Sequence, residues 1–149
     1  MHAESVVRDP TDMRLTLTTP ALPVRDVRTA AGFYAERLGF ATGYLEDGFA
    51  RLLRDEAEIQ LWQAGDDSWR TVGEPGASPV RSGAESFLAG TASCRVQVED
   101  GIDALHVELA AAAVLHPSGH GTPTDTDWAT REFAALDLDG NLITFWQRR

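Results

Sequence analysis

Residues 50–63, ARLLRDEAEIQLWQ, and residues 134–147, AALDLDGNLITFWQ, carry one pattern twice in a chain of 149 residues. Both stretches place apolar strand-like runs on either side of a turn signal, at Asp55 in the first and at Asp139 in the second, as in a β-hairpin. At one fixed offset they share six identities: Ala50/Ala134, Leu52/Leu136, Asp55/Asp139, Ile59/Ile143, Trp62/Trp146 and Gln63/Gln147. The sequence therefore predicts an internal duplication.

The residues before the first hairpin complete a module. The β-rich stretch 15–24 is broken by Pro20 and Pro23, and proline cannot donate to a strand ladder. This stretch is therefore an edge strand, a strand ending or a crossing between subunits. The remaining signals of the first module are an N-cap at Asp26, a helix at 27–38 ended by Gly39, and strands at 40–46, 49–55 and 57–63.

The same order returns in the second half of the chain. A strand at 94–98 precedes an apolar helix at 102–113, which Asp100 is expected to open, and the second hairpin follows. Two βαβββ modules predict an α+β fold. The expected organisation is a flexible arm at 1–13 and a single domain at 14–149, with modules at about 14–63 and 92–149. The long connecting loop at 64–91 is a lid or a disordered linker, and we expect a lid.

Composition and charge exclude several classes of protein. The formal net charge of -10 disfavours nucleic acid and favours a cationic partner, although the acid could serve solubility alone. The single Cys94 excludes an intrachain disulfide and is expected to be buried. No signal peptide or membrane-spanning stretch is visible, so we expect no membrane partner and a cytoplasmic location.

The hairpin strands also predict which side chains share a face. Side chains alternate across a strand, so Gln60 and Trp62 face away from Ile59 and Leu61. The second hairpin sorts in the same way, with Thr144 and Trp146 opposite Ile143 and Phe145. The polar and aromatic face has the composition of a pocket lining, although Trp62 and Trp146 could equally be core residues.

Three stretches resemble one protein family. RDVRTAAGFYAERLGF at 25–40, EDGFARLLRDEAEIQLW at 46–62 and WATREFAALDLDGNLITFW at 128–146 are similar to the vicinal-oxygen-chelate superfamily, and within it to bleomycin resistance proteins. The resemblance implies a curved mixed sheet with a concave pocket and with the helices on the convex side. It also implies that the protein binds and sequesters the drug without modifying it.

Enzymes of this superfamily hold a divalent metal with His or Glu side chains on four strands. The matching positions here are Thr19, Gln60, Ser93 and Thr144. Hydroxyl and amide oxygens bind divalent ions far more weakly than imidazole or carboxylate, so we expect neither a metal nor another cofactor. Glu58, two residues before Gln60 on the same face, is the one candidate that could rescue a metal site.

Other catalytic patterns are also missing from the sequence. His2, His106, His116 and His120 include one close pair, but Pro117 argues against the helix on which that pair could bind a metal. Cys94 is expected to be inaccessible, and no serine lies in a nucleophile-elbow context. We therefore predict no catalytic residue.

The resemblance implies a specific binding site and assembly. In the family a planar drug unit stacks between an aromatic of the first module and a Trp of the loop before the last hairpin, which match Phe49 and Trp128. Homodimers exchange the N-terminal strand about a proline, and Pro20 matches that hinge. The other residues expected to line the site are Gln60, Trp62, Ser93, Arg131, Thr144 and Trp146.

The expected function is resistance to bleomycin-type antibiotics by binding a cationic, metal-chelating glycopeptide. Trp128 lies in an otherwise polar loop, although it could also only cover the end of the sheet. Two alternatives stay open: a lyase-like or dioxygenase-like enzyme acting on a small metabolite, and a binder of an unrelated small molecule. The long loop, with Trp69 and Phe87, could alter the ligand that is bound.

Overall fold

The computed structural model describes residue 9, residues 11–65, residue 75, residues 88–119 and residues 121–149. The first module contains β1 (Ala21–Val24), α1 (Val27–Phe33), the π-helical turn η1 (Tyr34–Leu38), β2 (Ala41–Glu46), β3 (Phe49–Arg54) and β4 (Ala57–Gln63). The second module contains β5 (Ser93–Gln97), α2 (Ile102–Ala111), β6 (Thr124–Asp125), β7 (Thr130–Leu136) and β8 (Leu142–Arg148).

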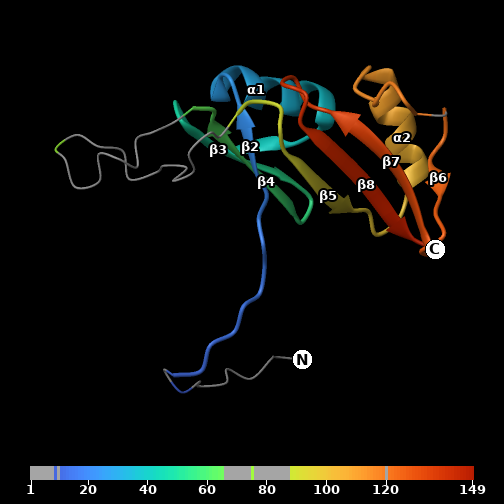
Figure 1. Ribbon diagram of the computed structural model, residues 1–149, viewed down its shortest axis with the longest axis horizontal. Helices are drawn as coiled ribbons and strands as arrows, with labels where there is room; N and C mark the ends of the chain where they lie inside the picture. The colour runs from blue at the N-terminus through green and yellow to red at the C-terminus, as the bar shows by residue number, and fades with distance from the viewer. Residues whose placement is uncertain (1–8, 10, 66–74, 76–87, 120) are drawn as a thin grey trace.

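Each module forms its own four-stranded mixed sheet, which confirms the α+β fold. The strand orders are β1-β4-β3-β2 and β5-β8-β7-β6, so the two halves have the same topology. In each sheet the first strand lies parallel to the last one, and the other neighbours are antiparallel. Each helix packs on the sheet of its own module (Figure 1). We call the side of each sheet that faces away from its helix the open face.

The limits of α1 and η1 follow from the residues at the two ends. Asp26 caps the helix through a bond from the Thr29 backbone N–H to its carboxylate at 2.9 Å. Gly39 adopts a left-handed φ of 74°, which glycine reaches without strain, and it ends the helix as expected. The helical face toward the sheet buries Val27, Ala30, Ala31, Tyr34 and Leu38.

The start of α2 differs from the prediction. Its N-cap is Gly101, with φ of 91° and no side-chain cap bond, and not Asp100. The Ile102 backbone N–H instead donates to Oε1 of Gln147, from β8, at 2.9 Å. A side chain distant in sequence thus replaces the local acidic cap.

The two hairpins do not align throughout as the sequence comparison predicts. Trp62 lies opposite Phe49, whereas Trp146 lies opposite Glu132 and not opposite Phe133. The matches between β4 and β8 fit this pairing, but the matches Ala50/Ala134 and Leu52/Leu136 on β3 and β7 are wrong by one residue. The reason is that the turn from Leu136 to Leu142 is longer than the turn from Leu53 to Glu58 by one residue.

Buried polar contacts join the two modules. The Tyr34 hydroxyl donates to Asp137 at 2.8 Å, and the Asn141 side-chain amide donates to the Pro23 carbonyl at 2.8 Å. Cys94 is buried, as expected, in the hydrophobic core that the two modules share. Burial, together with the nearby Asp137 carboxylate, raises the pKa of its thiol to about 11. The thiol is therefore protonated at neutral pH.

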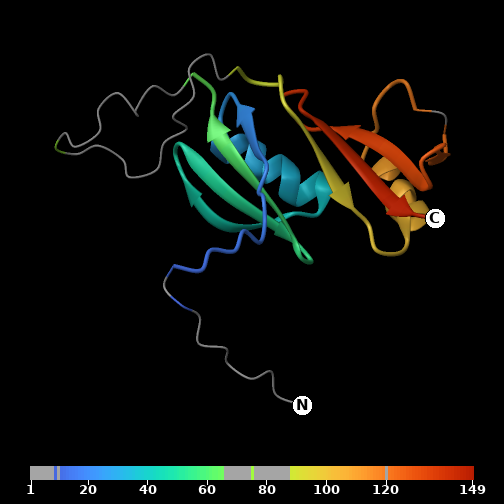
Figure 2. The same ribbon diagram turned by 60° about the horizontal axis from the view of Figure 1, so that its bottom comes forward.

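The N-terminal part of the predicted first strand lies outside the sheet. Only Ala21–Val24 pairs with β4, whereas residues 11–19 run away from the domain (Figure 2). Leu15 and Leu17 on this segment are 100% and 89% exposed. Most of the expected lid, including Trp69 and Phe87, and also His2 and His120, lie outside the described residues. Among the described helices, none is long and apolar enough to cross a membrane.

Candidate ligand-binding faces

The open face of module 1 carries an aromatic cluster. Phe49 packs edge-on against Trp62, with 4.8 Å between the ring centroids, and Tyr44 lies 6.0 Å from Phe49. Phe49 is only 8% exposed, whereas Tyr44 is 46% exposed. Trp62 is half-buried, as the alternation with the buried Ile59 and Leu61 predicts. Tyr44 is thus the accessible ring of the cluster, and the sequence reasoning missed it.

The polar part of this face is internally paired. Arg51 binds Glu58 in a bidentate ion pair, with nitrogen–oxygen distances of 2.7 and 3.2 Å. The Gln60 side-chain amide donates to the same carboxylate at 3.0 Å. The bonds from Arg51 and then from Gln60 hold the pKa of Glu58 below its ordinary value. The Glu58 carboxylate is therefore ionised and already accepts hydrogen bonds from Arg51 and Gln60.

The open face of module 2 carries Trp146 between two arginines. The guanidinium carbons of Arg148 and Arg95 lie 5.2 and 5.8 Å from the ring centroid, within the range of cation–π attraction. Thr144 lies opposite Arg95 across β5 and β8, and Ser93 at the start of β5 is exposed. Ser93, Thr144 and Trp146 therefore share one face, as predicted.

Trp128 lies in the connection between β6 and β7, where it is 66% exposed. The connection is a tight turn, because the Thr126 backbone N–H donates to the Thr130 carbonyl at 2.8 Å and Ala129 adopts a left-handed φ of 64°. The indole N–H of Trp128 donates to Oε2 of Glu132 at 3.0 Å. The ring is thus held by its edge while most of its surface stays accessible.

Glu132 is the most connected side chain of this face. Besides Trp128, it accepts from the Thr130 hydroxyl at 2.6 Å and from Arg95 at 2.7 and 3.2 Å. These bonds, that of Arg95 first, lower the pKa of Glu132 to about 2. The sequence reasoning missed Glu132, although alternation along β7 places it on the face opposite the buried Phe133.

Arg131 does not lie on this face. Its side chain lies on the helix side of β7, where it forms ion pairs with Asp103 of α2 at 2.7 Å and with Asp125 of β6 at 3.0 Å. Adjacent residues on a strand point in opposite directions, so Arg131 and Glu132 cannot both face the same ligand. The structure thus separates Arg131 from the other residues that were expected to line the site.

Within one chain the two groups of predicted site residues are far apart in the fold. Phe49, Gln60 and Trp62 belong to the first sheet, whereas Trp128 lies beside the far edge strand of the second. The β2–β3 hairpin and β6 lie at opposite ends of the molecule in both views (Figures 1 and 2). A single chain therefore does not bring Phe49 and Trp128 together.

This combination of duplicated modules and open faces has counterparts among known proteins. A family model described as the Glyoxalase/Bleomycin resistance protein/Dioxygenase superfamily matches residues 16–145. The chain belongs to this superfamily. The match spans both modules, so the resemblance of the quoted stretches is confirmed over nearly the whole domain.

Relatives within the superfamily are similar in sequence and in structure. Proteins named bleomycin resistance protein, from Geobacillus stearothermophilus and Staphylococcus aureus, are 48% identical over 129 residues, which cover 87% of this chain and 94% of each relative. A solved bleomycin-binding protein complexed with bleomycin is 24% identical, with a TM-score of 0.63 over 91% of this chain and 100% of that chain. Another, from Streptomyces verticillus with copper(II)-bleomycin, is 22% identical, with a TM-score of 0.63 over 90% and 97%.

The positions at which superfamily enzymes are expected to hold a metal do not fit one here. Thr19 is exposed on the N-terminal segment, outside β1, and the Gln60 amide is bonded to Glu58. In the described part of the chain, no group of three or more His, Cys, Asp or Glu side chains is arranged to hold a metal ion. His106 is buried against Phe133, and Nδ1 of His116 is bonded within its own turn.

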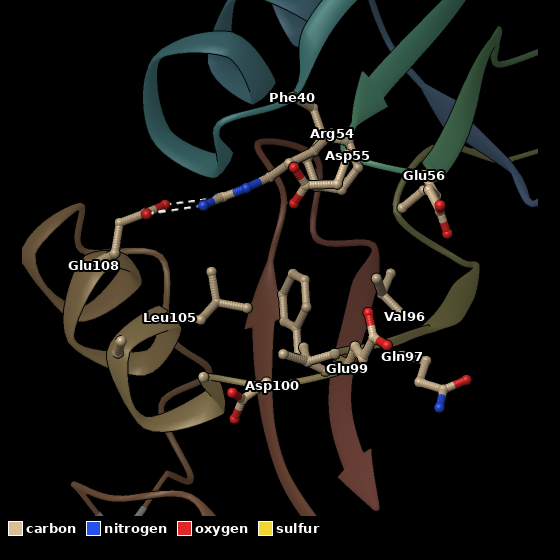
Figure 3. A pocket seen from close by; sticks show the side chains of 15 residues that line it. Phe40, Arg54, Asp55, Glu56, Val96, Gln97, Glu99, Asp100, Leu105 and Glu108 are labelled. Carbon is tan, nitrogen blue, oxygen red and sulfur yellow. Dashed lines mark hydrogen bonds and ion pairs between the residues drawn. The ribbon is translucent and has the colours of Figure 1, made fainter.

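A groove of about 890 Å³ lies between the modules on the helix side of the sheets (Figure 3). It runs between the β3–β4 turn and the N-terminal end of α2. The lining includes apolar side chains and carboxylates, among them Val96, Leu105, Phe145, Asp55, Glu99 and Asp100. Arg54, also at the groove, is paired with Glu108 at 2.7 Å. Carboxylates therefore outnumber basic side chains along this groove. The groove is separate from the open faces.

Proposed function

We propose that this protein binds and sequesters a bleomycin-type glycopeptide antibiotic, without modifying it and without a resident metal. The observation that carries the proposal is the 48% identity, along nearly the whole domain, to proteins named bleomycin resistance protein. The replacement of the expected metal ligands by Thr19, Gln60, Ser93 and Thr144 supports binding over catalysis.

The open face of module 2 has the chemistry that such a ligand needs. The exposed Trp128 offers a surface on which a flat heteroaromatic unit can stack, and stacking of this kind contributes roughly 1–3 kcal/mol per ring. The net charge of -10 attracts a cationic drug during encounter. Thr144 and Ser93 add hydroxyl groups that can bond to polar parts of the ligand.

We further propose that the binding unit is a homodimer in which module 1 of one subunit faces module 2 of its partner. The separation of Phe49 and Trp128 within one chain supports this, because only a second copy can supply both aromatics to one site. Gln60, Trp62 and the half-exposed Tyr44 would then line the side opposite Trp128, with the buried ring of Phe49 packed behind Tyr44 and Trp62. Arg131 is left out, because it faces α2.

The N-terminal segment supplies a means of dimerisation. Met13, Leu15 and Leu17 are 93%, 100% and 89% exposed, so this segment offers apolar surface that a partner subunit would cover. Pro20 directly precedes β1, as a hinge for strand exchange requires. The groove beside the edge strand β5 offers apolar surface for these side chains and acid for Arg14.

Titration of the purified protein with copper(II)-bleomycin, followed by calorimetry, tests the proposal. We expect binding at micromolar drug or below, with a Trp128→Ala variant weaker by about 1–3 kcal/mol, or roughly 5- to 150-fold. Val107→Ala is the matched control, because Val107 is 69% exposed on α2 and its truncation should leave the affinity unchanged. Absence of binding by the unaltered protein at micromolar drug would refute the proposal.

The fate of the drug separates sequestration from catalysis. After prolonged incubation with a small amount of protein, mass spectrometry should recover the antibiotic intact. Any product that accumulates beyond the amount of protein present would show turnover and would replace binding with an enzymatic function.

A further inference from the structure

Trp128 is exposed on a connection between strands, yet the edge of its indole has a hydrogen-bond partner. Its N–H is bonded to Oε2 of Glu132 at 3.0 Å. We propose that Glu132 is a positioning residue for ligand binding, which holds the indole of Trp128 by its edge so that the ring surface is presented to a planar ligand. The inference rests on the proposed function, because it takes Trp128 as the stacking surface.

Glu132 is itself fixed from two further directions. The Thr130 hydroxyl donates to Oε2 at 2.6 Å, and the Arg95 guanidinium donates to both carboxylate oxygens at 2.7 and 3.2 Å. A carboxylate with three partners on separate elements keeps one orientation, so it can transmit that orientation to the indole. Its depressed pKa of about 2 means that it stays ionised throughout any neutral binding assay.

Comparison of the two modules supports a role beyond packing. Glu132 lies directly opposite Trp146, and the structurally equivalent position in module 1 is Phe49, opposite Trp62. There the pair of rings packs at 4.8 Å between centroids. An acid at the equivalent place in module 2 gives up that packing but supplies an acceptor for the indole of Trp128.

The expected effect on affinity follows from conformational entropy. A ligand that stacks on a freely rotating side chain must first immobilise it, at a cost of about 0.5–1.5 kcal/mol, which corresponds to roughly 2- to 13-fold in affinity. A ring that is already held by Glu132 avoids most of this cost. Loss of the anchor should therefore weaken binding by roughly 3- to 10-fold, at the low end of the roughly 5- to 150-fold expected for loss of the ring itself.

A double-mutant cycle with copper(II)-bleomycin tests the coupling. Glu132→Leu removes the acceptor at similar size, and Trp128→Phe keeps a ring but removes the N–H. We expect Glu132→Leu to weaken binding 3- to 10-fold when it is the single change, and less than 2-fold when it is added to Trp128→Phe. An equal loss in both backgrounds would overturn the proposal, because Glu132 would then act through something other than the indole. Glu132→Gln retains an acceptor oxygen and should recover part of the affinity.

A measurement without drug separates this proposal from the proposed function. In ¹H–¹⁵N spectra of the full chain, the indole N–H signal of Trp128 should shift and exchange faster with water in Glu132→Leu, while that of Trp62 stays unchanged. An unmoved Trp128 signal would refute the anchor even if the drug binds, whereas a moved signal without drug binding would refute only the function. Should Glu132→Leu fail to fold, Thr130→Val, which removes one bond to Glu132, should shift the Trp128 signal in the same direction, and no shift would count against the anchor.

Discussion

At the level of single residues, exposure and hydrogen bonding decide which predicted site residues can meet a ligand. Phe49 and Trp128 were expected to act alike, but Phe49 is covered by its neighbours and Trp128 is open. Sequence predicts the strand that carries Phe49 and the connection that carries Trp128, since alternation and loop position are local properties. It does not predict that Tyr44 and Trp62 enclose Phe49, because that depends on cross-strand packing.

The depressed pKa of Glu132 makes a prediction for stability against pH. Its value of about 2 lies below the ordinary 4.5, so the unfolded chain takes up the proton first as the pH falls. The stabilisation from its bonds is complete above about pH 4.5 and is lost as the pH falls toward 2. Urea unfolding at pH 6, 4 and 3 should show a smaller loss of stability for Glu132→Gln than for the unaltered protein. Arg95→Met, which removes the main cause of the shift, should reduce the loss in the same direction, and parallel curves for all three proteins would contradict the assignment.

At the level of elements, local signals predicted the limits of the helical segment formed by α1 and η1 well, and the hairpin register less well. Asp26 at its start and Gly39 at its end each act within one turn, so their residue types suffice to predict these limits. The cap of α2 comes from Gln147 on β8, which no local pattern shows. The hairpin register depends on turn length, and the one-residue difference between the two turns was invisible to an alignment without gaps.

The segment that leads into β5 contains a glycine that should not tolerate a side chain. Gly90 adopts φ of 78°, and a Cβ there would collide with the backbone oxygen of Asp139 in the β7–β8 turn. Gly65 also has a positive φ, of 71°, but a Cβ there would meet nothing within 4 Å. We expect Gly65→Ala to cost about 1–2 kcal/mol from the left-handed conformation alone, and Gly90→Ala to cost more, measured by urea unfolding. Equal costs would show that the turn moves aside without difficulty.

At the level of the whole molecule, the duplication gives two modules with the same topology but with different side chains on their open faces. The family, the α+β class and the two modules were predictable, because they depend on repeated patterns along the chain. The separation of the Phe49 cluster from Trp128 could not be predicted, because it follows from how the modules pack on each other. Tyr34, Asp137 and Asn141 make contacts between the modules. Sequence could place each group of candidate site residues on its module, but it could not place the modules relative to each other.

Charges placed on the exposed N-terminal segment test the proposed homodimer. Leu15→Asp with Leu17→Asp should convert the protein to a monomer and weaken drug binding, because solvated carboxylates oppose burial of this segment. Thr16→Asp with Thr18→Asp adds the same charge at the alternate positions and is the matched control. Light scattering after gel filtration measures the mass, and a protein that is monomeric without any substitution would refute the dimer.

The separation of the Tyr44–Phe49–Trp62 cluster from Trp128 within one chain also affects how binding depends on protein concentration. A site that needs both groups is assembled only when two subunits meet, so binding capacity would fall faster than in proportion as the protein is diluted below its dimer dissociation constant. Protection by such a protein would begin at a threshold of expression, below which added copies give little benefit. Two complete sites would appear together in each dimer, so each pair of subunits would remove two molecules of drug.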